Sequence, residues 1–329
     1  MLLFVAVPIG LAACGSSTTG TSATSTQATA TIGFNGTVDG GTGPFAYGIE
    51  HGLYTKEGVH LVPRTVSGGS ALAQYLSSGK LDFGANVTAA DVLKYDSKGF
   101  HLVSIFGTVQ VGPAAVIVPA ASSIKSIKDL AGKSVAVGIG TTTSSLLPAL
   151  LKANGLSASQ VQIEDVATSA LPTLLTAGKV DSVLGFFNGL AVSLDGKGFP
   201  VRSLLFSNFG VPLNGGGLVT TEQEIKQHPA VVREVVAATQ KAFIASEKDN
   251  AAEVAAIQKL DGVTAPSAST IEQQIKVSQT AFETKADKGH PLGYQATADW
   301  LATERTASEY LGLTNAPKVT AAMTNKFLP

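Results

Sequence analysis

The stretch SALAQYLSSGKLD, residues 70–82, recurs 99 residues later as SALPTLLTAGKVD, residues 169–181. Seven of the thirteen positions are identical, and each copy follows a run of strand-type residues, 59–62 in the first case and 161–163 in the second. The alternative is that both segments need the same residues for the turn from a helix into a strand. That alternative explains the common Gly-Lys-x-Asp ending, but it explains the common Ser-Ala-Leu start less easily. Two copies of one strand–helix–strand unit therefore predict two similar lobes.

Strand-type runs alternate with helical patterns from residue 31 onwards, which is typical of an α/β architecture. The C-terminal third is helical, and Pro229 suits the first turn of a helix. We expect an α/β fold of two lobes, each a sheet flanked by helices. Residues 32–118 plus 219–329 form the first lobe and 119–218 the second. Two strands that cross near 118–119 and 217–218 act as hinges between them.

The N-terminal residues predict export and a lipid anchor. Residues 2–11 form an apolar run too short to span a bilayer, and it ends in Leu11-Ala12-Ala13-Cys14. This tetrapeptide resembles the bacterial lipobox, so we expect 1–14 to be a signal peptide and Cys14 to be lipidated, on the outer face of the cytoplasmic membrane. No basic residue precedes the run, which departs from an ordinary signal peptide, and a buried apolar strand is the alternative. Residues 15–31, almost wholly Gly, Ser, Thr and Ala, predict a disordered tether.

Composition argues against several function classes. Cys14 is the only cysteine, so the folded body has no disulfide and no thiolate metal site. A net charge of −1 gives no indication of nucleic-acid binding. The five histidines are scattered, and there is no Gly-x-Ser-x-Gly elbow or P-loop. We expect a monomeric binding protein with no catalytic residue, metal or cofactor, and not an enzyme.

Candidate ligand-binding residues lie where strands end and helices begin. Ligands bind at the carboxyl ends of strands in open α/β sheets, and helix N-termini favour acceptor or anionic groups. Short hydroxyl side chains there have an alternative role as caps of their own helices. One of the two neighbouring phenylalanines after residue 184 points into the cleft, because side-chain direction alternates along a strand. The residues expected to bind the ligand are Phe34, Asn35, Pro44, Phe45, Gly69, Ser70, Asn86, Thr88, Thr141, Thr142, Thr143, Phe186, Phe187 and Asn188.

From residue 32 to its end, the chain resembles the binding proteins of the alkanesulfonate and thiamine-pyrimidine branch of ABC importers. The resemblance is carried by PFAYGIEHGLY at 44–54, GGSALAQYLSSGKLDFG at 68–84, DLAGK at 129–133 and GKVD at 178–181. FFN at 186–188 and TNKFLP at 324–329 are similar to the pyrimidine-binding side of the branch. The early Trp-x-Pro-Asn of that side is absent, and Phe34-Asn35-Gly36 stands in its place.

The resemblance implies a type 2 periplasmic-binding fold and the substrate-binding role in an ABC importer. Such a protein captures a small organic ligand between its lobes and delivers it to a membrane permease driven by a partner ATPase. The expected ligand is a thiamine-precursor pyrimidine or a related heteroaromatic molecule, and flavin-like, sulfonate, taurine and nitrate-type ligands are alternatives. A pyrimidine-synthesising enzyme with a pyridoxal cofactor shares the fold, but the cysteine-rich segment of that branch has no counterpart here.

Overall fold

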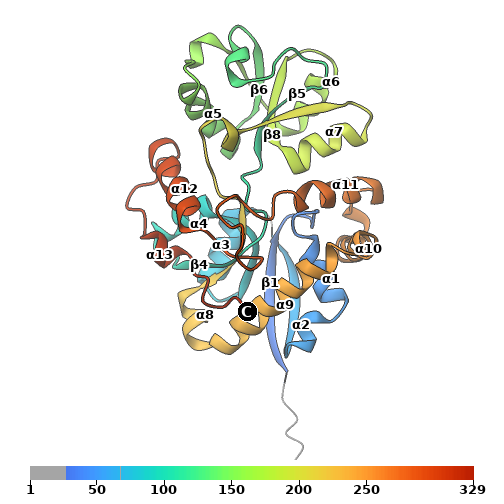
Figure 1. Cartoon of the computed structure of the whole chain (residues 1–329), viewed down its shortest axis with the longest axis vertical. Helices are drawn as coiled ribbons and strands as arrows, with labels where there is room; N and C mark the ends of the chain where they lie inside the picture. Colours follow the sequence, from blue (N-terminus) through green and yellow to red (C-terminus); the bar gives the residue numbers. More distant parts are fainter. Residues whose placement is uncertain (1–26, 67) are drawn as a thin grey trace, which may run out of the picture.

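The computed structural model describes residues 27–66 and 68–329. They form two α/β lobes, one above the other along the long axis of the molecule, and the chain passes between the lobes twice (Figure 1). The predicted signal peptide, Cys14 and most of the predicted tether lie outside the described residues. Within the described part, no helix is both long enough and apolar enough to cross a membrane.

The first lobe is built on a mixed sheet with the strand order β2-β1-β3-β10-β4. Its strands are β1 (Ala28–Asn35), β2 (Val59–Val66), β3 (Phe83–Thr88), β4 (Leu102–Gly107) and β10 (Gly216–Thr221). Strand β1 runs parallel to β2 and β3, whereas β10 runs antiparallel to β3 and β4. The helices of this lobe are α1 (Gly43–Glu50), α2 (Leu53–Lys56), α3 (Gly69–Ser77), α4 (Ala89–Asp96), α8 (Glu222–Gln227), α9 (Pro229–Ser246), α10 (Asn250–Asp261), the 3₁₀ turn η6 (Gly262–Thr264), α11 (Ala268–Gln279), α12 (Thr297–Tyr310) and α13 (Val319–Ala322).

The second lobe repeats this plan with the strand order β7-β6-β8-β5-β9. Its strands are β5 (Ala114–Pro119), β6 (Ser134–Gly138), β7 (Gln162–Val166), β8 (Ser182–Phe186) and β9 (Val201–Leu205). Its helices are α5 (Thr142–Ala153), α6 (Leu171–Thr176) and α7 (Val192–Gly196), with the short 3₁₀ turns η1 (Ile127–Leu130), η2 (Ala158–Gln160), η3 (Thr168–Ala170) and η5 (Phe206–Phe209) and the π-helical turn η4 (Phe187–Ala191). Here β6 is parallel to β7 and β8, and β5 is antiparallel to β8 and β9. The matching sheets confirm the predicted fold class.

The two copies of the sequence repeat occupy equivalent places in the two sheets. Each forms a helix, α3 or α6, that leads into the central strand β3 or β8. Asp82 accepts the N–H and the hydroxyl of Thr31 at 2.7 and 2.8 Å, and the Asp82 N–H donates to that hydroxyl at 3.0 Å. Asp181 makes the same three bonds with Ser134, at 2.9, 3.0 and 2.8 Å. In both copies the aspartate hydrogen-bonds the central strand to its parallel neighbour. This shared role explains why the aspartate is common to the two copies.

Three predicted boundaries are wrong. Residues 28–31, expected in the disordered tether, form the first half of β1, because they pair with β2 from Ala28 opposite Val59 onwards. Residues 114–118, expected in the first lobe, form β5 of the second sheet, where they pair with β8 and β9. The first crossover therefore lies at 108–113 instead of 118–119. The second crossover ends before Gly216, because β10 already belongs to the first sheet.

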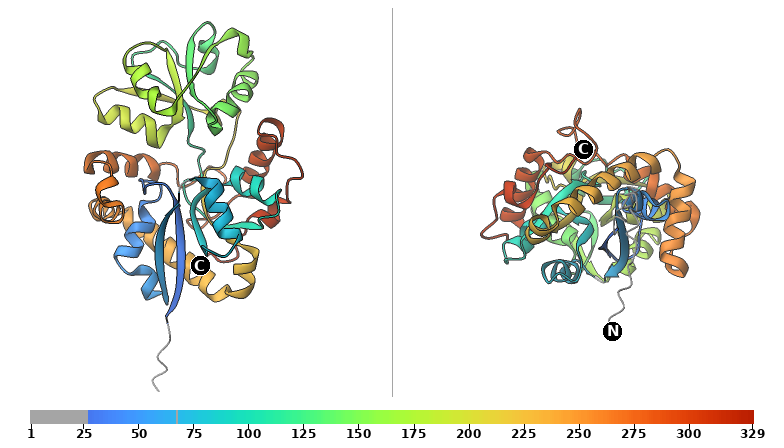
Figure 2. Two further views of the ribbon diagram at one scale, coloured as in Figure 1. Left: turned by 180° about the vertical axis from the view of Figure 1, so that it is seen from behind. Right: turned by 90° about the horizontal axis from the view of Figure 1, so that it is seen from below.

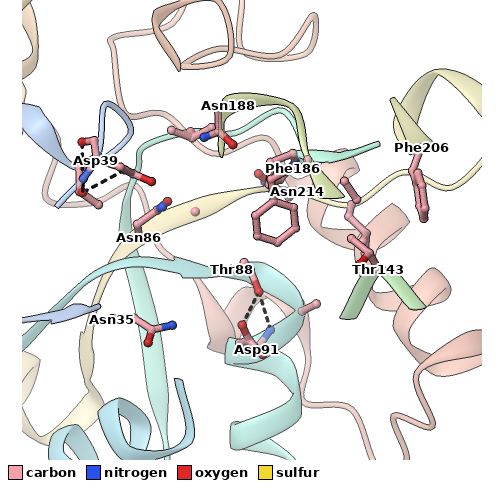
Figure 3. A pocket seen from close by; sticks show the side chains of 18 of the residues that line it. Asn35, Asp39, Asn86, Thr88, Asp91, Thr143, Phe186, Asn188, Phe206 and Asn214 are labelled. Carbon is pink, nitrogen blue, oxygen red and sulfur yellow. Dashed lines mark hydrogen bonds between the residues drawn. The ribbon is translucent and has the colours of Figure 1, made fainter. Parts of the chain in front are cut away.

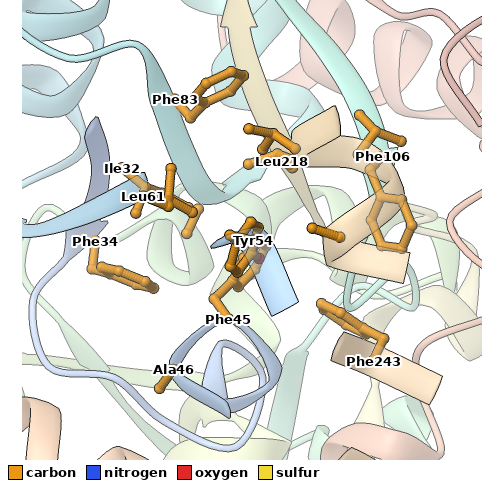
Figure 4. Packing of buried hydrophobic residues seen from close by; sticks show 14 of the residues in the cluster. Ile32, Phe34, Phe45, Ala46, Tyr54, Leu61, Phe83, Phe106, Leu218 and Phe243 are labelled. Carbon is orange, nitrogen blue, oxygen red and sulfur yellow. The ribbon is translucent and has the colours of Figure 1, made fainter. Parts of the chain in front are cut away.

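A cluster of aromatic side chains fills the core of the first lobe (Figure 4). Phe45, Phe106 and Phe243 are fully buried between the sheet and its helices. The Phe243 ring lies 5.5 Å from that of Phe45 and 5.4 Å from that of Phe106, centroid to centroid. Burial of a side chain of this size stabilises a fold by about 1.5–3 kcal/mol.

The C-terminal helices also touch the second lobe (Figure 2). Helix α11 contacts α7 and the π-helical turn η4, and α12 contacts α5. The Lys152 ammonium on α5 lies 3.2 Å from the Glu309 carboxylate on α12. The Thr303 hydroxyl on α12 accepts the N–H of Asn214 at 2.7 Å, which holds the second crossover against this helix.

Candidate functional site

A cavity of about 340 Å³ lies between the two sheets (Figure 3). Strands β1 and β3 of the first sheet and β8 of the second end at it, and both crossovers pass along it. This is the place where open α/β sheets bind ligands. No described group of three or more acidic, histidine or cysteine side chains is placed to hold a metal ion.

The structure brings half of the predicted site residues to this cavity. Those that line it are Phe34, Asn35, Asn86, Thr88, Thr143, Phe186 and Asn188. They come from both lobes, as the repeat predicted. Phe34 is only 3% exposed, so most of its ring belongs to the core and a small part reaches the cavity.

The remaining predicted residues lie elsewhere. Phe45 is fully buried in the aromatic core, and Pro44 is buried beside it in the first turn of α1. Gly69 borders a separate small pocket of about 30 Å³ behind the cavity, next to Ser70 in the first turn of α3.

The threonines predicted to bind the ligand at the start of α5 have different roles: one caps the helix and another lines the cavity. Thr141 caps the helix by accepting the N–H of Ser144 at 3.2 Å, so the alternative role as a cap is correct for it. Thr143 is buried and lines the cavity. The side chain of Thr142 lies outside what the structure describes.

Of the two neighbouring phenylalanines, Phe186 faces the cavity. Its side chain is 46% exposed, which is high for an aromatic residue, and it lies on the cavity wall. Phe187 begins the π-helical turn η4, donates its N–H to the Pro113 carbonyl at 3.0 Å and packs against the cores of both lobes. The turn also brings Asn188 back to the cavity, where its side chain is 7% exposed.

Asn86 connects the cavity to the crossovers. Its backbone has a φ of 54°, in the left-handed region that asparagine tolerates better than most residues. Its Oδ1 accepts the hydroxyl of buried Thr108 at 3.2 Å, and the Thr108 N–H donates to the Gly216 carbonyl at 2.9 Å. A Cβ on Gly216 would overlap the Asn86 side chain, so this position needs glycine because of the close approach.

Asp39 supplies a half-buried carboxylate that the sequence prediction missed. Its Oδ1 accepts the N–H groups of Gly41 and Thr42 at 2.9 and 3.2 Å and the Thr42 hydroxyl at 3.1 Å. Burial raises the pKa of Asp39, and these hydrogen bonds oppose the rise. The second oxygen, Oδ2, lies on the cavity side of the loop (Figure 3).

Asp91 is a second carboxylate on the cavity wall. The Thr88 hydroxyl donates to its Oδ2 at 2.8 Å and accepts the Asp91 N–H at 3.1 Å, which fixes the start of α4. Signals for both aspartates are present in the sequence. Asp39 stands shortly before the proline that starts a helix, and Thr88-x-x-Asp91 has the spacing of a capping box.

Among curated proteins, the chain is similar to a putative thiamine biosynthesis protein of Haemophilus influenzae. The two are 33% identical over 97 residues, which cover 30% of this chain and 31% of that protein. The chain therefore matches less than a third of this relative's length.

Solved structures show a wider similarity in fold. The periplasmic aliphatic sulphonate binding protein of Escherichia coli has a TM-score of 0.69 and 17% identity, covering 90% of this chain and 97% of its own. The alkanesulfonate-binding protein of Xanthomonas axonopodis pv. citri, solved with bound MOPS, has a TM-score of 0.62 and 20% identity, covering 90% and 98%. The protein therefore has the fold of periplasmic binding proteins.

Residues 41–251, more than half of the chain, match the family model described as NMT1/THI5 like. The match includes the start of α1, both sheets' central strands and most of the cavity wall. The resemblance predicted from the sequence is confirmed: the chain belongs to the NMT1/THI5-like family.

Proposed function

We propose that this protein is the extracytoplasmic substrate-binding component of an ABC importer. The observation that carries the proposal is the cavity between two similar sheets, joined by two crossovers along its wall. A ligand held there favours the conformation in which both lobes contact it, and it shifts the population toward that closed form. The closed form delivers the ligand to a membrane permease, and a partner ATPase drives uptake.

The ligand that we propose is a small heteroaromatic molecule of the thiamine-precursor pyrimidine type. The exposed ring of Phe186 offers a stacking surface, and Asn188 offers both a donor and acceptors to ring substituents. Similarity to the putative thiamine biosynthesis protein of Haemophilus influenzae supports this choice. The alternative is an anion of the sulfonate, taurine or nitrate type, because the similar solved structures include sulfonate-binding proteins.

A thermal-shift screen over pyrimidines, flavins, sulfonates and nitrate tests the role, followed by calorimetry on the best compound. Loss of the Asn188 amide leaves a polar ligand group unpaired, so Asn188→Ala lowers affinity about 5- to 150-fold, or about 1–3 kcal/mol. Phe209→Ala is the control, because Phe209 is half-buried and is not among the residues that line the cavity. Unchanged affinity in a folded Asn188→Ala protein would contradict this site.

We also propose that the protein binds its ligand without converting it. The cavity wall holds aspartates and a serine, but no histidine, lysine or cysteine among the described lining residues that would activate them. Mass spectrometry after long incubation should return the bound compound unchanged. A product formed in an amount equal to the protein or greater would favour the enzyme of the same fold instead.

Lipid anchoring through Cys14 completes the proposal and rests on the Leu11-Ala12-Ala13-Cys14 motif alone. Two or more acyl chains make a stable anchor, because each buried CH₂ contributes about 0.8 kcal/mol. Expressed with its leader, the protein should fractionate with membranes, and Cys14→Ser should release it. Identical fractionation of the two forms would refute the anchor without touching the binding role.

A further inference from the structure

The cavity is acidic. Asp39 and Asp91 line it from different elements, and no lysine, arginine or histidine occurs among the described lining residues. Asp261, at the end of α10, lies behind Asp39 and accepts the Val38 N–H at 2.8 Å. Burial raises the pKa of Asp261, and the charge of Asp39 adds to the rise. Acidic side chains therefore gather at and behind this wall, and no basic side chain stands among the described lining residues to balance them.

The start of α1 does not offer an anion site, although a helix N-terminus normally favours negative groups. Asp39 accepts the N–H groups of Gly41 and Thr42 with its side chain and that of Gly43 with its carbonyl, at 2.7 Å for Gly43. Pro44, the next residue, has no N–H to give. The protein's own aspartate has taken the place that a ligand anion would occupy.

The start of α4 is occupied in the same way. Asp91 stands in the first turn, where its charge meets the positive end of the helix dipole. Its N–H and one of its oxygens are both bonded to Thr88. An anionic ligand approaching this end would meet the Asp91 carboxylate before it met the helix.

Polar atoms that make no hydrogen bond to described residues face the cavity beside these carboxylates. Asn188 is 7% exposed, and its amide has no hydrogen-bond partner among the residues that the structure describes. Hydrogen bonds to the Asp39 carboxylate from described groups all go to Oδ1. Neither the Asn188 amide nor Asp39 Oδ2 is fully enclosed, so both are open to the cavity, where a ligand can supply their hydrogen-bond partners. Phe186 adds an exposed aromatic face, which attracts a cation as well as a ring.

We propose that the ligand is an aromatic or heteroaromatic molecule that carries a cationic nitrogen, whose N–H groups donate to the Asp39 carboxylate while Asp91 supplies a second negative charge. This inference rests on the proposed function, since it places the ligand in the same cavity. Charge-assisted hydrogen bonds of this kind are roughly twice as strong as neutral ones. A sulfonate or nitrate ion would instead lose its water beside two carboxylates, with no basic side chain on the wall to compensate.

Three probes of nearly the same shape test the charge preference: benzamidine, benzamide and benzenesulfonate, which carry a positive, no and a negative charge at neutral pH. Calorimetry on the full chain should give the tightest binding for benzamidine and the weakest for benzenesulfonate. Binding of the sulfonate as tight as that of benzamidine would overturn the inference. So would failure of benzamidine to bind at millimolar concentration.

Variants then identify the groups responsible. Asp39→Asn keeps an oxygen for the Gly41 and Thr42 N–H groups but removes the charge, so benzamidine affinity should fall about 10- to 150-fold while benzamide affinity changes little. Asp91→Asn should act in the same direction if Asp39→Asn proves unstable in a melting experiment. Asp165→Asn, on the exposed strand β7, removes an equal charge outside the cavity and should change nothing.

The pattern across variants separates this inference from the proposed function. If Asn188→Ala weakens benzamidine binding but Asp39→Asn and Asp91→Asn do not, the cavity remains the binding site and the role of the carboxylates is refuted. If none of the three changes has an effect, the probe binds elsewhere and the cavity itself is refuted as the site.

Discussion

Glu253 makes the stability of the first lobe depend on pH. It lies in the first turn of α10 and is 1% exposed, and neither carboxyl oxygen has a hydrogen-bond partner among the described residues. Burial raises the pKa of Glu253 from 4.5 to about 8; the nearby Ser246 hydroxyl opposes this rise, and the neighbouring Glu247 charge adds to it. The folded protein therefore keeps a proton that the unfolded chain releases above pH 4.5.

The sign of the effect follows from that proton. Between the two pKa values the folded state binds more protons than the unfolded state, so the free energy of unfolding falls as the pH rises. At about 1.4 kcal/mol per pH unit, the loss between pH 5 and pH 7 is about 3 kcal/mol, and it is complete by about pH 8. Glu253→Gln has no proton to lose, so it should match the parent protein near pH 5 and exceed its stability by about 3 kcal/mol near pH 7.

Urea unfolding, followed by circular dichroism at several pH values, measures this difference. Glu272→Gln is the matched control, because that carboxylate is exposed on α11 and paired with Lys276 at 2.6 Å. The control should leave the slope of stability against pH unchanged. Parallel curves for the parent and Glu253→Gln would refute the buried, protonated carboxyl.

Two further predictions concern the repeat and the crossover. Asp181→Ala removes the hydrogen bonds between β8 and β6 and should lower the free energy of unfolding by about 1.5–3 kcal/mol. Asp82→Ala should cause a similar loss in the first lobe, and urea unfolding measures both. A loss for only one of the two variants would show that the two aspartates are not equivalent. Gly216→Ala should displace the Asn86 side chain and weaken binding of the compound found in the screen, as measured by calorimetry. Gly196→Ala, at a position where a Cβ first meets the end of the Gln273 side chain at 3.3 Å, should leave that affinity unchanged.

The repeat predicted the fold because its residues act locally. Asp82 and Asp181 fasten neighbouring strands, and the helices that precede them close at Gly79 and Gly178, with φ values of 69° and 63°. Such features are visible in a single sequence, since each depends on residue type and spacing. The boundary at β5 was not visible, because residues 114–118 are an apolar run that fits the interior of either sheet. Only pairing with β8 and β9 assigns it to the second lobe.

The site was harder to predict because the same residues serve helices and ligands. Glycine and hydroxyl groups at three helix starts pointed to acceptor or anionic groups on the ligand, as is expected for a bare helix end. The end of α1 is not bare: Asp39, the first charged residue of the chain, folds back onto it from the loop and reverses the local charge. One side chain outside the helix, Asp39, thus decides whether the start of α1 attracts or repels an anion. Tertiary packing sets the direction in which this side chain points. The cationic ligand that we propose rests on that direction, which no spacing in the sequence records.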